Sequence, residues 1–87
     1  MEKQNFRCYY LSGGGKEYDG GIWEKKETNK TIIFKQIKES FFNPNWVELK
    51  LYKDKTRNKK HSFRDWGDGD YTIYPDQCGT PYIFKPI

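Results

Sequence analysis

Apolar and polar side chains alternate along several short stretches of the chain, and a period of two is typical of half-buried β-strands. In residues 5–11 the alternation places Phe6, Cys8 and Tyr10 on one face of a predicted strand. Residues 46–52 form the clearest strand, in which the alternating sets are Val47, Leu49 and Leu51 against Trp46, Glu48, Lys50 and Tyr52. Both segments are therefore predicted to be strands with one buried and one outward face.

The middle of the chain holds a charged strand and an ambiguous segment. Residues 22–28 carry four charged side chains in succession, which suits an edge strand because charge discourages edge-to-edge aggregation. Residues 29–30 are expected to form a two-residue turn into residues 31–42. In that segment large apolar side chains recur every four positions, as on a helix face, whereas its β-branched start favours a strand. A strand is the preferred interpretation, with a short helix near 32–42 as the alternative.

The remaining segments complete a β-rich domain without a linker or a repeat. Further strands are predicted at residues 61–66, 70–74 and 81–85. Loops are predicted at residues 12–21, 53–60 and 75–80, and a tight turn at residues 67–69. The fold class is therefore mainly β: one domain over residues 1–87, an antiparallel meander of six or seven short strands that forms a small barrel or a curved sheet.

Composition supports this interpretation. Sixteen of the 87 residues are aromatic, whereas the chain has three Leu, one Val and no Ala. Ala and Leu are good helix formers and aromatic residues suit a pleated surface, so a helical bundle is excluded. The mean hydropathy of -1.08 raises the question of disorder, but disordered segments are poor in aromatic residues. We therefore expect an ordered domain with an aromatic core.

Location and redox state follow from what the sequence lacks. No stretch approaches the ~20 apolar residues that a membrane helix needs, and the first residues form no apolar signal region. We therefore expect a cytoplasmic protein with no membrane partner. Cys8 and Cys78 are the only cysteines, and in a reducing cytosol two thiols are the expected state. The alternative is that they meet, if the first and last strands are neighbours.

Motifs for phosphate binding, catalysis or metal binding are not matched, because the residues they require are missing or wrongly spaced. The glycine-rich segment 13–16 has no glycine at position 10, and Glu17 stands where a phosphate loop needs Ser or Thr. The acidic segment 65–70 lacks the spacing and the closing Glu of a calcium loop. His61 is the only histidine and there is no CxxC pair, so a zinc site has too few ligands. We predict a non-enzyme without a metal or a cofactor.

Charge is unevenly distributed in the C-terminal half. Residues 53–64 contain one acid and six bases, which are Lys53, Lys55, Arg57, Lys59, Lys60 and Arg64. Rings on the outward faces of the predicted strands are Tyr9, Trp46, Tyr52 and Tyr74. Basic side chains contact phosphates while aromatic rings stack on bases, so these two sets predict a small module that binds nucleic acid.

A protein partner is the alternative. Residues 65–80 contain four acids and no base, so an acidic segment adjoins the basic one. Opposed charges and exposed aromatics are typical of protein interfaces, and the candidates here are Trp66, Asp65, Asp68 and Asp70. In size and general character the chain resembles short accessory proteins of phages and mobile elements, including anti-CRISPR and anti-restriction proteins. That resemblance implies a compact inhibitor that docks on a charged host protein.

Overall fold

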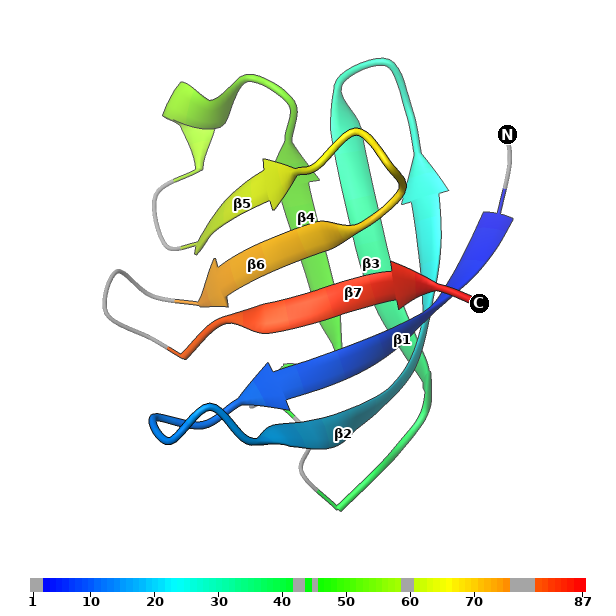
Figure 1. Cartoon of the computed structure of the whole chain (residues 1–87). Helices are drawn as coiled ribbons and strands as arrows, with labels where there is room; N and C mark the ends of the chain where they lie inside the picture. Colours follow the sequence, from blue (N-terminus) through cyan, green and yellow to red (C-terminus); the bar gives the residue numbers. More distant parts are fainter. Residues whose placement is uncertain (1–2, 42–43, 45, 59–60, 76–79) are drawn as a thin grey trace.

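Seven antiparallel strands form one curved sheet that closes almost completely into a barrel (Figure 1). The computed structural model describes residues 3–41, 44, 46–58, 61–75 and 80–87. The strands are β1 (Lys3–Leu11), β2 (Glu17–Glu27), β3 (Thr31–Lys38), β4 (Glu48–Tyr52), β5 (His61–Asp65), β6 (Tyr71–Pro75) and β7 (Tyr82–Pro86). A single 3-10 turn, η1 (Lys55–Arg57), is the one helical element of the described residues, and no helix among them is long and apolar enough to span a membrane.

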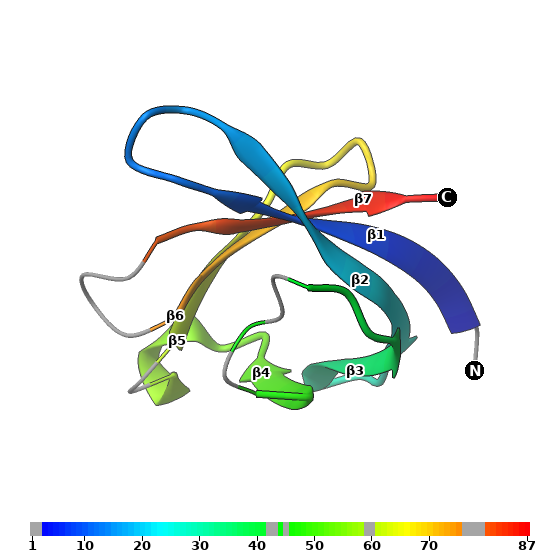
Figure 2. The same cartoon turned by 90° about the horizontal axis from the view of Figure 1, so that it is seen from below.

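The strand order is β4-β3-β2-β1-β7-β6-β5, so every strand except β4 pairs with the strand that follows it along the chain, and β7 returns to pair with β1. Within the described part of the chain no ladder joins β4 to β5, which leaves one seam in the barrel. Figures 1 and 2 show two walls on opposite sides of the core. We call the outer faces of β5, β6, β7 and β1 the front wall, and those of β2, β3 and β4 the back wall.

Aromatic rings fill the barrel. The buried apolar residues are Phe6, Cys8, Trp23, Ile32, Phe34, Leu49, Leu51, Phe63, Tyr71, Ile73, Tyr82 and Phe84. Phe6 meets the edge of Phe34 with ring centroids 5.5 Å apart, and Trp23 meets Phe84 at 5.4 Å. Edge-to-face pairs of this kind contribute about 0.5–1.5 kcal/mol beyond the area that they bury. The fold class expected from the sequence is confirmed, with seven strands.

The glycine-rich segment is not all loop. Only residues 12–16 turn, and β2 begins at Glu17, so the prediction of a loop over 12–21 is wrong. Gly20 and Gly21 lie inside β2, where the register against β1 shifts. A Cβ atom on Gly20 would lie 2.7 Å from the Sγ of Cys8, and Gly21 has a φ of 96°. These glycines therefore allow a close approach of two strands and an irregularity in the ladder.

The charged strand is not at an edge. β2 pairs with β1 on one side and with β3 on the other, so the prediction of an edge strand over 22–28 is wrong. Its charges are accommodated by local contacts: the Nζ of Lys25 donates to the hydroxyl of Tyr71 (3.3 Å) and lies 3.3 Å from Glu27. The segment after the Asn29-Lys30 turn is strand β3 rather than a helix. Pairing on both sides outweighs the four-residue spacing there.

Trp46 does not face outward, which corrects its assignment as an exposed stacking ring. Alternation breaks before β4, which begins at Glu48 rather than at position 46. The ring of Trp46 is half-buried and lies 4.9 Å from that of Trp23, centroid to centroid, while Val47 is 64% exposed. Trp46 therefore packs against the aromatic core and is not available on the surface to stack on a base.

Cys8 is a free, buried thiol on the inner face of β1. Burial is the main cause that raises its pKa far above the usual value, and the nearby carboxylate of Asp19 adds to the shift. Cys78 lies outside the described residues. The Cys8 thiol therefore stays protonated and poorly nucleophilic over the physiological pH range.

Candidate nucleic-acid interface

Tyr52 projects from the outer face of β4 at the seam of the barrel. The side-chain amide of Asn58 accepts from the backbone N–H of Tyr52 at 3.0 Å and donates to its carbonyl at 2.9 Å. These are the two hydrogen bonds that a neighbouring strand would otherwise make. Asn58 therefore holds the end of β4 in place where the ladder is interrupted.

Two cations lie over this ring, and a third lies over the ring of Phe63. The guanidinium carbon of Arg57 lies 4.2 Å from the centre of the Tyr52 ring, and the Nζ of Lys50 lies 5.5 Å from it. Lys55, on the same turn as Arg57, places its Nζ 4.9 Å from the ring of Phe63. Cation–π contacts at exposed sites stabilise by about 0.5–1 kcal/mol, so these side chains are loosely held.

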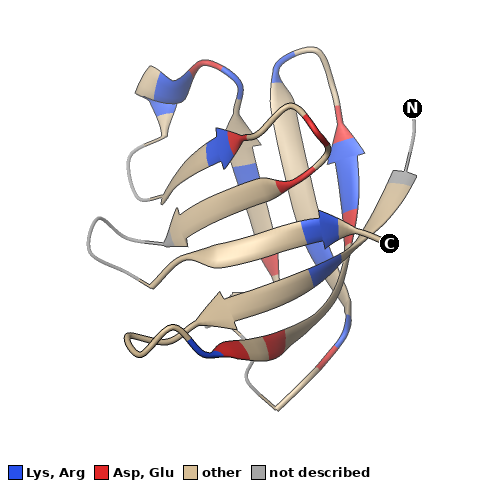
Figure 3. Ribbon diagram, viewed as in Figure 1, with Lys and Arg blue, Asp and Glu red and all other residues tan. Residues whose placement is uncertain are grey.

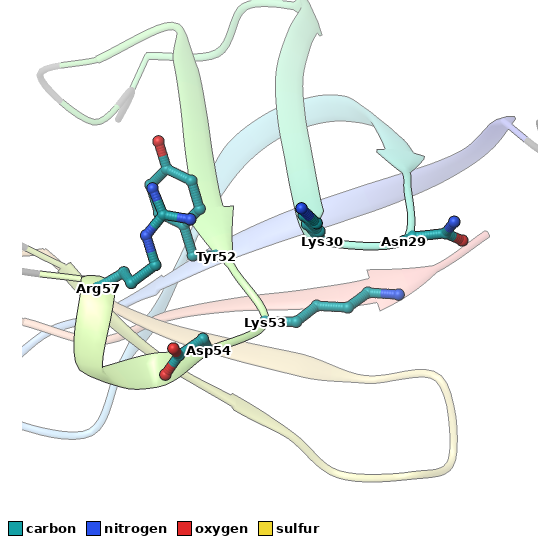
Figure 4. A pocket seen from close by; sticks show the side chains of 6 residues that line it. All are labelled: Asn29, Lys30, Tyr52, Lys53, Asp54 and Arg57. Carbon is teal, nitrogen blue, oxygen red and sulfur yellow. The ribbon is translucent and has the colours of Figure 1, made fainter.

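A pocket of about 340 Å³ opens beside the ring (Figure 4). Its lining residues are Asn29, Lys30, Tyr52, Lys53, Asp54 and Arg57. The backbone N–H of Lys53 donates to the carbonyl of Lys30 at 2.9 Å, which joins the β2–β3 turn to the end of β4. Three separate segments therefore bring a cation to one hollow: the hairpin turn, the end of β4 and η1.

Two carboxylates lie in this region and both are already bonded. Asp54 accepts from the backbone N–H and the hydroxyl of Thr56 at 3.2 and 2.7 Å, and the hydroxyl contact is the main cause that lowers its pKa. Glu27 lies 2.7 Å from Lys53 and 3.3 Å from Lys25, and the bond from Lys53 is the main cause that lowers its pKa. Both groups are therefore ionised at neutral pH.

We define the Tyr52 cluster as Tyr52 with five neighbouring cations: Lys30, Lys50, Lys53, Lys55 and Arg57. Two of them, Arg57 and Lys50, lie over the ring of Tyr52. Against Asp54 and Glu27 the cluster holds an excess of three positive charges. This end of the back wall is therefore positively charged.

The structure brings together only part of the residue set predicted from the sequence. Tyr52, Lys53 and Arg57 converge at the pocket, and Lys55 lies over the ring of Phe63 instead. Lys59 and Lys60 lie outside the described residues. Tyr9, Arg64 and Tyr74 lie on the front wall, away from Tyr52. Two cations of the cluster were missed, Lys30 and Lys50. The sequence contains the pattern that predicts both as exposed cations. Lys30 lies in the predicted turn, and Lys50 alternates with Leu49 and Leu51, so it points to the outward face.

The front wall carries both positive and negative side chains (Figure 3). Trp66 is 50% exposed, yet its indole N–H donates to the hydroxyl of Thr72 at 2.8 Å and the Arg64 guanidinium carbon lies 4.1 Å from its ring. Farther along the wall the Nζ of Lys85 lies 5.7 Å from the ring of Tyr9. Trp66 is therefore held by a hydrogen bond as well as by a cation, whereas the ring contact of Tyr9 is with a cation.

Acidic side chains border the front wall at the turn between β5 and β6. Asp65 accepts from the backbone N–H of Gly67 at 2.9 Å, and Asp68 accepts from that of Asp70 at 3.0 Å. Asp68 and Asp70 form no ion pair among the residues that the structure describes. The front wall thus carries both signs of charge, whereas the Tyr52 cluster is predominantly positive.

Comparison of the chain with protein-family models, with curated proteins and with solved structures finds no match. Within the described ranges no three His, Cys, Asp or Glu side chains are grouped as a metal site would require.

Proposed function

We propose that the protein is a small non-catalytic module that binds single-stranded nucleic acid at the Tyr52 cluster. The observation that carries the proposal is the grouping of cations beside one outward-facing ring, that of Tyr52, whose backbone Asn58 holds in place. Among the described residues only Lys53 of the five cations forms an ion pair. The other four are available to phosphates, which supply most of the affinity in this class of complex.

The binding mode follows from the energies of the competing contacts. A base stacked on a protein ring contributes about 1–3 kcal/mol, more than the ~0.5–1 kcal/mol of an exposed cation–π contact. A base therefore replaces Arg57 over the ring of Tyr52. The released guanidinium is then able to donate two parallel hydrogen bonds to a phosphate.

A single strand fits better than a duplex. Stacking on Tyr52 needs a base whose face is exposed, and bases within a duplex are already stacked on their neighbours. The cluster is also compact, since its cations come from one turn, one strand end and η1. We therefore expect a short site with little sequence preference, because every base has a face that stacks.

The direct test is fluorescence anisotropy with labelled oligothymidine and oligouridine at increasing salt. The logarithm of affinity should fall linearly with the logarithm of salt, with a slope of about -0.7 for each phosphate that the protein neutralises. Arg57→Ala should weaken binding and make the slope shallower. Lys16→Ala, in the exposed β1–β2 turn, is the matched control for removal of one charge. Absence of binding to both oligonucleotides at low salt would overturn the proposal.

A second candidate function is docking to a charged protein through the front wall, as a compact inhibitor or accessory protein would dock. The specific observation is Trp66, which is half exposed but held by Thr72 and Arg64. Trp, Tyr and Arg are the residues that most often dominate protein interfaces, and rigid rings lose little entropy on binding. In this case Trp66→Ala should abolish capture of one reproducible partner, while Tyr52→Ala should leave it intact.

A further inference from the structure

We infer that the pocket beside Tyr52 binds the terminal phosphate monoester of a nucleic-acid strand, so that the protein recognises phosphorylated strand ends. This inference rests on the proposed function and adds the chemical group that the pocket takes. It concerns Lys30, Lys53 and Arg57, the three cations of the lining.

A terminal phosphate differs in charge from a phosphate inside a strand. A phosphodiester carries one negative charge, whereas a phosphate monoester carries about 1.5 to 2 at neutral pH and has three oxygens that accept hydrogen bonds. Three cations around one hollow suit the more highly charged group. Elsewhere in the cluster Lys50 and Lys55 lie outside the pocket lining, where they are placed to meet single phosphodiesters.

The two carboxylates near the pocket reduce its positive charge but do not cancel it. Asp54 lines the pocket and is ionised, since its Oδ1 accepts from both donors of Thr56, and with the three cations it leaves an excess of two positive charges in the lining. Glu27 is shared by two lysines, because Lys25 lies 3.3 Å from Oε1 and Lys53 lies 2.7 Å from Oε2. Glu27 therefore keeps a cationic partner when Lys53 turns from it to a phosphate.

Donor geometry also suits a phosphate. Arg57 offers a planar fork of N–H groups and the lysines offer rotatable ammonium groups. In Figure 4 the Lys53 side chain extends away from Arg57, so it turns toward the pocket when a phosphate binds. Tyr52 forms one side of the same hollow, so a phosphate in the pocket is adjacent to the ring on which the neighbouring base stacks. The volume of about 340 Å³ lies at the lower end of the range for small-ligand sites, about 300–1,000 Å³.

The experiment compares oligothymidines of one length that carry a 5′-phosphate, a 3′-phosphate or hydroxyls at both ends. We expect at least one phosphorylated form to bind about tenfold more tightly than the hydroxyl form, as charge-assisted hydrogen bonds to the extra charge predict. The end that is preferred identifies the polarity of the bound strand. Lys30→Ala and Lys53→Ala should each remove most of this preference while the hydroxyl form still binds.

Lys35→Ala is the matched control, because Lys35 is an exposed lysine on β3 outside the pocket, and it should keep the preference. Each variant is checked for an unchanged thermal unfolding midpoint. Equal affinity for all three oligonucleotides would overturn this inference but leave the proposed function standing. A preference that survives in both pocket variants would also overturn it. If no oligonucleotide binds, the proposed function is wrong and the inference falls with it.

Discussion

The guanidinium carbon of Arg57 lies 4.2 Å from the centre of the Tyr52 ring. This contact brings η1 back onto the end of β4, the strand that precedes it along the chain. Both partners are positioned independently of it, since Asn58 holds the backbone of Tyr52 and Asp54 holds the start of η1. The contact can therefore open without disturbing the fold, which a binding site for a stacked base requires.

Replacement of Tyr52 tests the stacking role. Tyr52→Ala should weaken binding of single-stranded oligonucleotides by about 1–3 kcal/mol, roughly 5- to 150-fold, because a stacked base is lost. Tyr52→Phe should bind nearly as well as the unmodified protein, since it keeps the ring. Tyr74→Ala removes an exposed ring from the front wall and serves as the control. An equal loss of affinity in the Tyr52 and Tyr74 variants would contradict the assignment to the back wall.

Asn58 is expected to stabilise the seam of the barrel. Asn58→Ala leaves the backbone N–H and carbonyl of Tyr52 without their hydrogen-bond partners and should cost about 1–3 kcal/mol. For a chain of this size each kcal/mol lowers the melting temperature by about 4–8 °C, which calorimetry detects. Ser62→Ala, an exposed position on β5, is the control and should change little. An unchanged melting temperature for Asn58→Ala would show that water replaces the amide at no cost.

The ion pairs of Glu27 predict how stability depends on pH. The folded state lowers the pKa of Glu27 below its usual value of 4.5, chiefly through the bond from Lys53. Its contribution is therefore fully present above the unfolded pKa and is lost as the pH falls through the folded pKa. Because the side chain is 40% exposed, solvent screening limits the contribution to less than about 1 kcal/mol.

Denaturant titrations of the unmodified protein and of Glu27→Gln measure this contribution. The difference in unfolding free energy between them should be constant from neutral pH down to about pH 5.5, and should shrink at more acidic pH. A difference that grows on acidification has the opposite sign and would contradict the assignment of these ion pairs.

Gly20 allows β1 and β2 to approach each other closely. Gly20→Ala would bring a Cβ atom to 2.7 Å from the Sγ of buried Cys8, and overpacking of this kind should cost about 1–3 kcal/mol. Gly14→Ala is the matched control, because a Cβ there meets nothing within 4 Å. Cys8→Ala should recover part of the loss when it is combined with Gly20→Ala. Additive effects of these two substitutions would contradict the steric explanation.

Local patterns predicted the elements that depend on local chemistry. Alternation located most of the strands, as in residues 5–11, and the turn at residues 67–69 is explained by glycines with φ values of 82° and 103°. What the chain does not show locally is pairing between distant strands. The central position of β2 depends on its pairing with both β1 and β3. From the sequence alone Gly20 is assigned to a loop, because its close approach to Cys8 is visible only in the folded structure.

The sequence predicts only those residues of the candidate site that are close together along the chain. Lys53 and Arg57 are close in sequence and line one pocket, so one charged segment is enough to predict both. Lys30 joins them because β3 pairs with β4, with Thr31 opposite Tyr52, and the bond from Lys53 to Lys30 extends that ladder. Outward-facing rings were expected to act together, but the strand order places Tyr52 on a different wall from Tyr9 and Tyr74. Alternation gives the face of a ring within a strand, as for Tyr52, but not for Trp46, which precedes β4. Which wall a ring occupies depends on the closed sheet.

An amide NMR titration with a short oligothymidine locates the binding of nucleic acid, because it reports each residue separately and covers both walls in one experiment. If the strand binds the back wall at the Tyr52 cluster, chemical-shift changes are confined to residues 29–30 and 50–58, and the indole signal of Trp66 does not move. Shifts centred on Trp66 and the front wall, or no shifts at low salt, would exclude binding at the Tyr52 cluster.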